Sequence, residues 1–308
     1  MREIKQLKKR FDFSTVPMNR SLVRVSIDWD GEPLLLFEEG RPSRPPIDAH
    51  RDALLGWMNS PPTAHVLVHW SEGKPNEVRF DSPTRLPIAM HVQPFANGWL
   101  LAESHGGHAR ICDKDGKVLS TLDLGDAIKH VQTTPGGLIW VGYFDEGVFG
   151  GGIGNAGLVC FNPSGLVIFK YSDFAKDYDL PFIDDCYTLN VMGPSVLVSY
   201  YSEFPYVLMN EFKLENVWRN QAPNKAVAVR GNRFVAFPAF HKPYLTTRTF
   251  ESDEESIWDL VDSEGTLLSR PAEGPPETPS RGSYVPFRCA ARYGRMYVYN
   301  DIGLYELP

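Results

Sequence analysis

Short apolar runs recur along this chain, each led by a turn that contains glycine and each preceded by another strand-like apolar run. Repeats of about 40 to 50 residues, made of short strands and turns, are typical of four-stranded blades arranged around an axis. The pattern therefore predicts a series of like units. The glycine-led runs are residues 31–37, 98–102, 137–141, 193–198, 231–237 and 294–299.

Each unit is expected to hold two hairpins. The first pairs an inner strand with the glycine-led strand, and the second opens with Asp or Asn and has Gly three residues later, as at residues 112–119, 161–168 and 261–268. Such a turn suits type I geometry closed by a left-handed residue. The sequence thus predicts an all-β fold, a six-bladed β-propeller of four-stranded antiparallel blades. The blades are expected near residues 19–81, 86–123, 128–172, 185–220, 225–270 and 286–308, within one domain over residues 1–308.

The last unit supplies only three strands before residue 308. An open strand edge would leave backbone groups unpaired, so another segment is expected to cover it. Residues 4–13 lie outside every repeat and could form the missing outer strand, which predicts a last blade closed by an N-terminal strand. An unpaired basic tail is the alternative.

The longest connections lie between strands two and three of a unit, or between one unit and the next. In an up-and-down blade, both classes of connection leave from the same rim. Because binding groups favour loops held on a rigid scaffold, the face that carries these loops, near the axis, is the expected site. The long connections are residues 38–63, 143–157, 172–185, 238–256 and 272–287.

Charge and composition narrow the range of partners. The chain has 308 residues, a formal net charge of -7 and a sequence pI of about 5.6, so no attraction to nucleic acid or to an anionic membrane is expected. No secretion signal or 18-residue apolar run occurs, which predicts a soluble, cytoplasmic protein without a membrane partner. The four cysteines form no CxxC pair and are expected to be buried, reduced thiols.

Acidic, aromatic and histidine side chains gather at strand ends on the long-loop face. Aromatic groups there could either line a pocket or pack between blades. His65, His69, His91 and His130 fall within or beside strands and are expected to be structural. The candidate ligand-binding residues are Glu103, His105, His108, Tyr143, Asp145, Glu146, Asp185, Tyr200, Tyr201 and Arg288.

Carboxylates that converge on an axis repel one another unless a cation neutralises them. The metal hypothesis therefore places Ca²⁺ or another divalent cation between Glu103, Asp145, Asp185 and Asn300, with His105 or Asp145 as general base. The alternative is that these acids are solvated or pair with Arg and backbone N–H groups. No other cofactor is predicted.

Two stretches resemble a known repeat. Residues 131–143, with Trp140-Val-Gly, and residues 157–165, with Asn162-Pro-Ser-Gly, are similar to the bacterial two-component-regulator propeller repeat. The resemblance implies propeller architecture, and shorter phrases look like stretches of uncharacterised bacterial propeller proteins. The sensor arrays carry membrane and kinase segments that this chain lacks, so a sensor role is not implied. Six-bladed lactonases of the gluconolactonase type, which hold an axial divalent ion, are similar at the level of fold only.

These observations favour a non-enzymatic binding protein that recognises a small molecule or a protein partner through the long-loop face near the axis. The competing hypothesis is a divalent-metal-dependent hydrolase or lactonase with an axial metal site. A third is a structural scaffold whose sides bind other proteins. The sequence leaves all three open.

Overall fold

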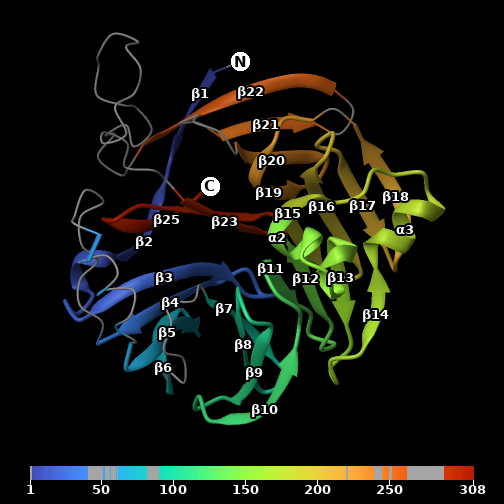
Figure 1. Ribbon diagram of the computed structural model, residues 1–308. Helices are drawn as coiled ribbons and strands as arrows, with labels where there is room; N and C mark the ends of the chain where they lie inside the picture. The colour runs from blue at the N-terminus through green and yellow to red at the C-terminus, as the bar shows by residue number, and fades with distance from the viewer. Residues whose placement is uncertain are drawn as a thin grey trace.

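Antiparallel sheets arranged in a ring around a common centre form this protein (Figure 1). The first strand of each sheet contacts the first strand of the next, and the contact between β23 and β3 closes the circle. The protein is therefore an all-β propeller, as the sequence predicted. The computed structural model describes residues 2–40, 51–52, 56, 60, 62–81, 90–219, 221–238, 245–249, 252–261 and 288–308.

Three sheets come from the N-terminal half of the described chain, and each has four antiparallel strands. The first sheet contains β3 (Arg20–Ile27), β4 (Pro33–Glu39), β5 (Ala64–Ser71) and β6 (Lys74–Asp81); the second contains β7 (Met90–Phe95), β8 (Gly98–Glu103), β9 (His108–Asp113) and β10 (Val118–Asp123); the third contains β11 (Ile128–Thr133), β12 (Ile139–Tyr143), β13 (Leu158–Phe161) and β14 (Val167–Lys170).

Two of the remaining sheets also have four strands, whereas the fifth sheet has five because an N-terminal strand joins it. The fourth sheet contains β15 (Asp185–Met192), β16 (Ser195–Tyr201), β17 (Tyr206–Asn210) and β18 (Lys213–Trp218); the fifth contains β19 (Asn224–Arg230), β20 (Arg233–Pro238), β21 (Leu245–Thr249), β22 (Ser252–Val261) and β1 (Arg2–Gln6); the sixth contains β23 (Arg288–Arg292), β24 (Arg295–Tyr299), β25 (Gly303–Glu306) and β2 (Lys8–Asp12).

The turns expected from Asp or Asn followed by Gly are present. The Asp113 carboxylate accepts the backbone N–H groups two and four residues later, and Gly116 closes the turn at φ 92°. Asn162 makes the same pair of bonds, and Gly165 has φ 79°. A positive φ is tolerated by Gly without steric cost, so this spacing sets both hairpins. The third such turn, predicted within residues 261–268, does not join strands three and four of the fifth sheet, because β21 and β22 meet at residues 249–252 and β22 ends at Val261. Residues 262–268 lie outside the described residues.

The N-terminal segment differs from the expectation of one strand over residues 4–13. β2 pairs antiparallel with β25 as the outer strand of the sixth sheet, but β1 pairs in parallel with β22 of the fifth. Leu7 lies between the two strands, is 2% exposed, and packs in the core shared by these sheets. Burying Leu7 there directs the residues on either side of it to different sheets.

Apolar side chains fill the space between neighbouring sheets. Within the described residues there are six buried clusters, and each joins two adjacent sheets of the ring. Cys112, Cys160 and Cys186 are buried free thiols, as expected, and Cys289 is free but partly exposed. Every sheet is thus held mainly by the two beside it.

Short helices lie on the face from which the long connections leave (Figure 1). The connection between β12 and β13 carries α2 (Asp145–Phe149) and η2 (Ile153–Ala156), and α3 (Tyr171–Asp177) precedes β15; η1 (Phe13–Thr15) follows β2. None of the helices described is long and apolar enough to cross a bilayer. The long connections predicted in residues 38–63 and 272–287 fall largely outside the described residues. The long connection predicted over residues 238–256 is wrong, because β21 and most of β22 lie within it and pair as an antiparallel hairpin.

One end of the axis is filled by polar side chains. Arg292, at the end of β23, is fully buried; one Nη donates to Gln93 Oε1 at 2.7 Å and to the Ile27 carbonyl at 3.2 Å, and the other donates to the Thr133 carbonyl. These partners belong to three other sheets. The guanidinium therefore spans the centre of the ring and joins four sheets.

Amide side chains complete this axial plug. Gln132 donates to the Leu189 carbonyl and accepts the Val191 N–H, which joins the third sheet to the fourth. Asn190 bonds to the Val227 carbonyl and to both backbone groups of Tyr293, which joins the fourth sheet to the fifth and sixth. We define the axial plug as Gln93, Gln132, Asn190 and Arg292.

Replacing Leu7 by Ala should lower the free energy of unfolding by about 2–4 kcal/mol, because a buried side chain is removed from the core between two sheets. Urea denaturation measures the loss. Ile4→Ala is the matched control, since Ile4 is 72% exposed on the same segment. Equal stability of the two variants would show that the N-terminal segment is a frayed tail.

Replacing Arg292 by Met should destabilise the fold by about 3 kcal/mol or more, because three acceptors in the axial plug lose their donor and buried unpaired acceptors are costly. Urea denaturation also measures this change. Arg233→Met, at an exposed position, is expected to stay within about 0.5 kcal/mol of the parent. A similarly small effect at Arg292 would contradict the role assigned to the plug.

Candidate functional site

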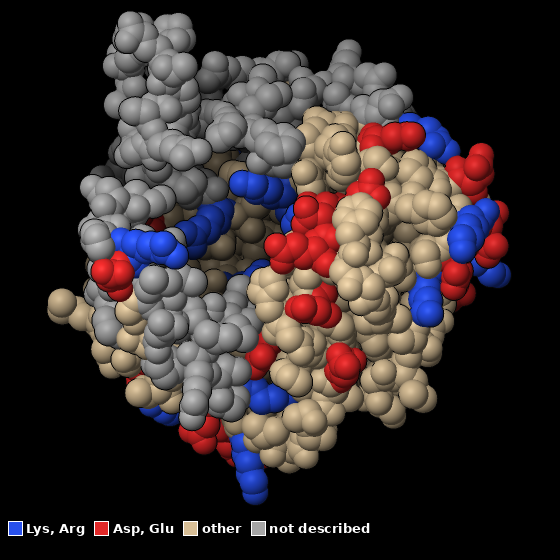
Figure 2. All heavy atoms as spheres, in the orientation of Figure 1, with Lys and Arg blue, Asp and Glu red and all other residues tan. Residues whose placement is uncertain are grey.

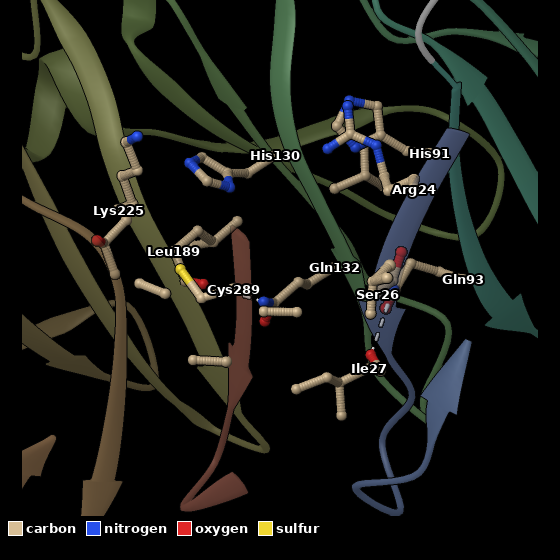
Figure 3. A pocket seen from close by; sticks show the side chains of 16 residues that line it. Arg24, Ser26, Ile27, His91, Gln93, His130, Gln132, Leu189, Lys225 and Cys289 are labelled. Carbon is tan, nitrogen blue, oxygen red and sulfur yellow. Dashed lines mark hydrogen bonds between the residues drawn. The ribbon is translucent and has the colours of Figure 1, made fainter. Parts of the chain in front are cut away.

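A pocket of about 120 Å³ lies on the axis, above the axial plug (Figure 3). Residues from the first strand of all six sheets line it, so its shape depends on the closed ring. In the view of Figure 3, His91, His130 and Lys225 lie toward one end, while Gln132, Gln93 and Ile27 lie toward the other. The lining residues are Arg24, Val25, Ser26, Ile27, His91, Gln93, His130, Val131, Gln132, Thr188, Leu189, Lys225, Ala226, Cys289, Ala290 and Ala291.

Polar residues alternate along several of the first strands. Residues two apart on a strand point to the same side, so one strand can present two polar groups at successive heights along the axis. His91 and Gln93 on β7, like His130 and Gln132 on β11, follow this spacing. Gln93 and Gln132 belong to the axial plug, whereas His91 and His130 lie farther along the axis and face the pocket.

Arg24 contributes a guanidinium to the wall. Its Nε donates to the Met90 carbonyl at 2.7 Å, which fixes the side chain between the first and second sheets. Burial lowers the pKa of Arg24, although an arginine remains cationic at neutral pH. The side chain keeps partial exposure through the pocket.

His91 and His130 are held by backbone acceptors. His91 Nε2 lies 3.3 Å from the Ile128 carbonyl and 3.1 Å from Ser104 Oγ, and His130 Nε2 lies 3.1 Å from the Cys186 carbonyl. Because a carbonyl only accepts, Nε2 of each ring carries the proton and Nδ1 carries the lone pair.

Both imidazoles are neutral at pH 7. Burial, with a smaller effect from Lys129 and then Arg24, lowers the pKa of His130 to about 3. Burial, with Arg24 and then His130, holds the pKa of His91 well below its usual value. Cations close to an imidazole disfavour its charged form. The pocket thus keeps the positive charge of Arg24 and adds none from histidine.

Charge is unevenly distributed around the mouth of the pocket. Figure 2 shows a central hollow with blue cationic side chains at its edge and a red acidic cluster where α2 lies. Lys129 pairs with Asp185 at 2.6 Å and lies 4.4 Å from the centre of the Tyr187 ring. Lys225 is exposed and has no ion pair within the described part of the chain. The lining itself includes no described Asp or Glu.

Three of the ligand-binding residues predicted from sequence are buried in the protein. Tyr143 donates its hydroxyl to the Leu124 carbonyl, and Tyr200 lies 2.7 Å from the hydroxyl of Tyr171. Glu103 is 4% exposed, and burial raises the pKa of its carboxyl. Tyr143 and Tyr200 therefore belong to the cores between sheets, which corrects their assignment to a ligand surface.

The other predicted ligand residues lie on the surface, except for Asp185, which is half-buried and paired with Lys129. His105 packs edge-on against Phe144, with ring centroids 5.5 Å apart, and so lies beside the start of α2. None of the ten lines the axial pocket as described. Their role in binding stays a prediction. The exposed residues are His105, His108, Asp145, Glu146, Tyr201 and Arg288.

The structure does not bring the predicted metal ligands together. Among the described residues, no group of three or more His, Cys, Asp or Glu side chains could hold a metal ion. Asn300 accepts backbone N–H groups from Ile302 and Gly303 and closes its own turn. Asp185 forms an ion pair with Lys129 at 2.6 Å. These placements lend no support to a shared site of Glu103, Asp145, Asp185 and Asn300, and their role as metal ligands stays a prediction.

Sequence reasoning missed Arg24 and Lys225 and expected His91 and His130 to be purely structural. The available signal was the alternation of polar residues in strands that are otherwise apolar. A polar group at every second position of an inner strand indicates a side facing the axis rather than a neighbouring sheet.

Comparisons with solved structures show the same fold. Hsv2 of Kluyveromyces lactis with loop 6CD replaced by a Gly-Ser linker has a TM-score of 0.53 and 9% identity, with 94% of this chain and 98% of that chain covered. The Pan2 WD40 domain of Neurospora crassa has a TM-score of 0.50 and 11% identity, with 99% and 98% covered. Identities this low show the propeller fold alone.

Sequence comparisons cover less of the chain. The model of the YxzG family matches residues 158–236, from β13 to β20. No curated protein matches the sequence. Among the solved structures, the extracellular domain of the putative hybrid two component system BT4673 from B. thetaiotaomicron is also similar, with a TM-score of 0.44 and 10% identity, and 98% of this chain and 39% of that chain covered.

Replacing His130 by Gln should reduce the acid sensitivity of the fold. Since the pKa of His130 is lower in the folded than in the unfolded state, the unfolded chain takes up the proton first, and stability falls as the pH drops below about 6.5. Removing the imidazole should lessen this fall by about 1.4 kcal/mol per pH unit. Urea denaturation between pH 7 and pH 4 measures the difference, and a histidine NMR signal of His130 that titrates near pH 6.5 would contradict the expectation.

Proposed function

We propose that this protein is a non-enzymatic binding protein whose six sheets act as six blades of one closed ring, and that a small molecule enters the axial pocket from the long-loop face. The observation that carries the proposal is the difference between the two ends of the axis. Arg292 and the amides of the axial plug close one end, whereas the other end is hollow and lined by polar groups from several strands.

The shape of the pocket favours a small ligand over a protein segment. Ligand sites are concave, with a few polar groups placed among apolar walls. Here Arg24, His91 and His130 face small or apolar side chains such as Ala226 and Ala290. A volume of about 120 Å³ suits a small molecule or the end of a larger one. The propeller neighbours support a binding scaffold in general terms.

The chemistry of the lining favours binding over catalysis. A histidine with a pKa of about 3, such as His130, is a weak base at neutral pH. Burial raises the pKa of the Cys289 thiol to about 12, so this group is a poor nucleophile. The described lining offers no carboxylate as a second proton-transfer group.

A ligand panel tests the proposal. The protein is heated with a hexose, an amino acid, a dicarboxylate or a nucleoside, and the melting temperature is followed. A ligand at about ten times its Kd adds about 1.4 kcal/mol of stability, which is a measurable shift. At least one panel member should stabilise the parent protein.

Filling the pocket should remove that shift. Ser26→Leu places a larger side chain on the pocket wall, and Ser120→Leu, on the exposed outer strand β10, is the control. The stabilisation should disappear in the first variant and persist in the second. Stabilisation that survives Ser26→Leu, or a panel without any effect on the parent protein, would overturn the proposal.

A further inference from the structure

The described lining of the axial pocket contains cationic side chains and no carboxylate. These cationic side chains belong to Arg24 and Lys225. The Arg24 Nε donates a hydrogen bond to the Met90 carbonyl, whereas neither Nη has a hydrogen-bond partner within the described residues. Asp185 is paired with Lys129, and the other acids near the mouth, such as Asp145 and Glu146 of α2, do not line the pocket.

The guanidinium of Arg24 is partly buried, and its Nη groups can donate to a ligand that enters the pocket. The planar fork of arginine matches the two oxygens of a carboxylate, and such charge-assisted pairs are among the strong hydrogen bonds in proteins. We propose that the axial pocket binds the carboxylate group of a small organic acid, with the Arg24 guanidinium as its main partner and Lys225 as a second cation on the opposite wall. This inference rests on the function proposed above and names its ligand class.

The neighbouring groups fit a carboxylate. His91 and His130 are fixed by their Nε2–H bonds to backbone carbonyls, so they hold the wall around Arg24 in place. Ser26, on the same strand as Arg24, makes room beside the guanidinium because its side chain is small. The walls between Arg24 and Lys225 include the small residues Ala290 and Ala291 of β23, which leave space for a short carbon chain.

A phosphate is the less favourable oxyanion. Phosphate sites in proteins usually gather several backbone N–H groups at a helix N-terminus or in a nest. The described lining consists of strand residues, and neither α2 nor α3 contributes to it. One guanidinium fork suits a planar monoanionic group better than a tetrahedral dianion.

Isothermal titration calorimetry tests the inference with three probes at matched ionic strength: succinate, inorganic phosphate and the neutral succinamide. Matching the salt removes general screening effects. Succinate should bind at least about tenfold more tightly than either of the others, which corresponds to about 1.4 kcal/mol. Equal affinity for succinamide, or tighter binding of phosphate, would overturn the carboxylate assignment.

Variants locate the contact. Arg24→Gln should weaken succinate binding at least tenfold, Arg24→Lys should recover part of it, and Lys225→Gln should weaken it less than Arg24→Gln. Arg233→Gln, at an exposed position away from the pocket lining, should leave the affinity unchanged. Unchanged binding in a folded Arg24→Gln variant would contradict the proposal.

If the Arg24→Gln variant does not fold, the histidine NMR signals of the parent protein test the same contact. A carboxylate beside Arg24 must perturb the His91 and His130 signals and raise the pKa of His130, and succinamide must not. Absence of these changes at saturating succinate would overturn the inference.

The two proposals fail in different ways. If a neutral probe binds the parent protein but not the Ser26→Leu variant, and succinate does not bind, the axial pocket is a binding site without a preference for carboxylates. No probe bound at all would overturn both.

Discussion

A buried guanidinium at the centre of the ring links four of its sheets and fixes how their inner strands meet. The first strand of each sheet has no neighbouring strand on its axial edge, so its backbone groups need other partners. Arg292 reaches acceptors on three other sheets, and Gln132 and Asn190 make equivalent bonds between the sheets that follow. The apolar clusters between sheets supply most of the burial, and the axial plug fixes where the inner strands meet.

The same strands serve both ends of the axis. Gln93 and Gln132 bond to neighbouring strands at the closed end, while His91 and His130, two residues earlier, face the hollow end. Because residues two apart on a β-strand point to the same side, each of these strands places one polar side chain in the axial plug and another in the pocket lining. Thr188 and Ala290 likewise line the pocket two residues before Asn190 and Arg292 of the axial plug.

Much of the fold could be predicted from the sequence because its signals are local. Asn162 with Gly165 sets a hairpin by itself, and the glycine-led runs mark the second strands. The pocket could not be predicted because its lining comes from six separated strands. Acids and aromatics at strand ends suggested a site, yet Asp185 pairs with Lys129 and Tyr143 packs in a core. Local pattern alone does not distinguish a side chain facing the axis from one facing the next sheet.

The pairing of β2 with β25 has a consequence for how this fold is made. It joins residues 8–12 to residues 303–306, so nearly the whole described chain lies between the two partners. On a ribosome, β2 emerges long before β25 exists, and the strand has no native partner in its sheet until synthesis passes residue 306. Contacts so distant in sequence slow folding because loop closure costs chain entropy first. Completion of the circle is therefore a late event, and the exposed flanks of the first and last sheets are the surfaces that need protection until then.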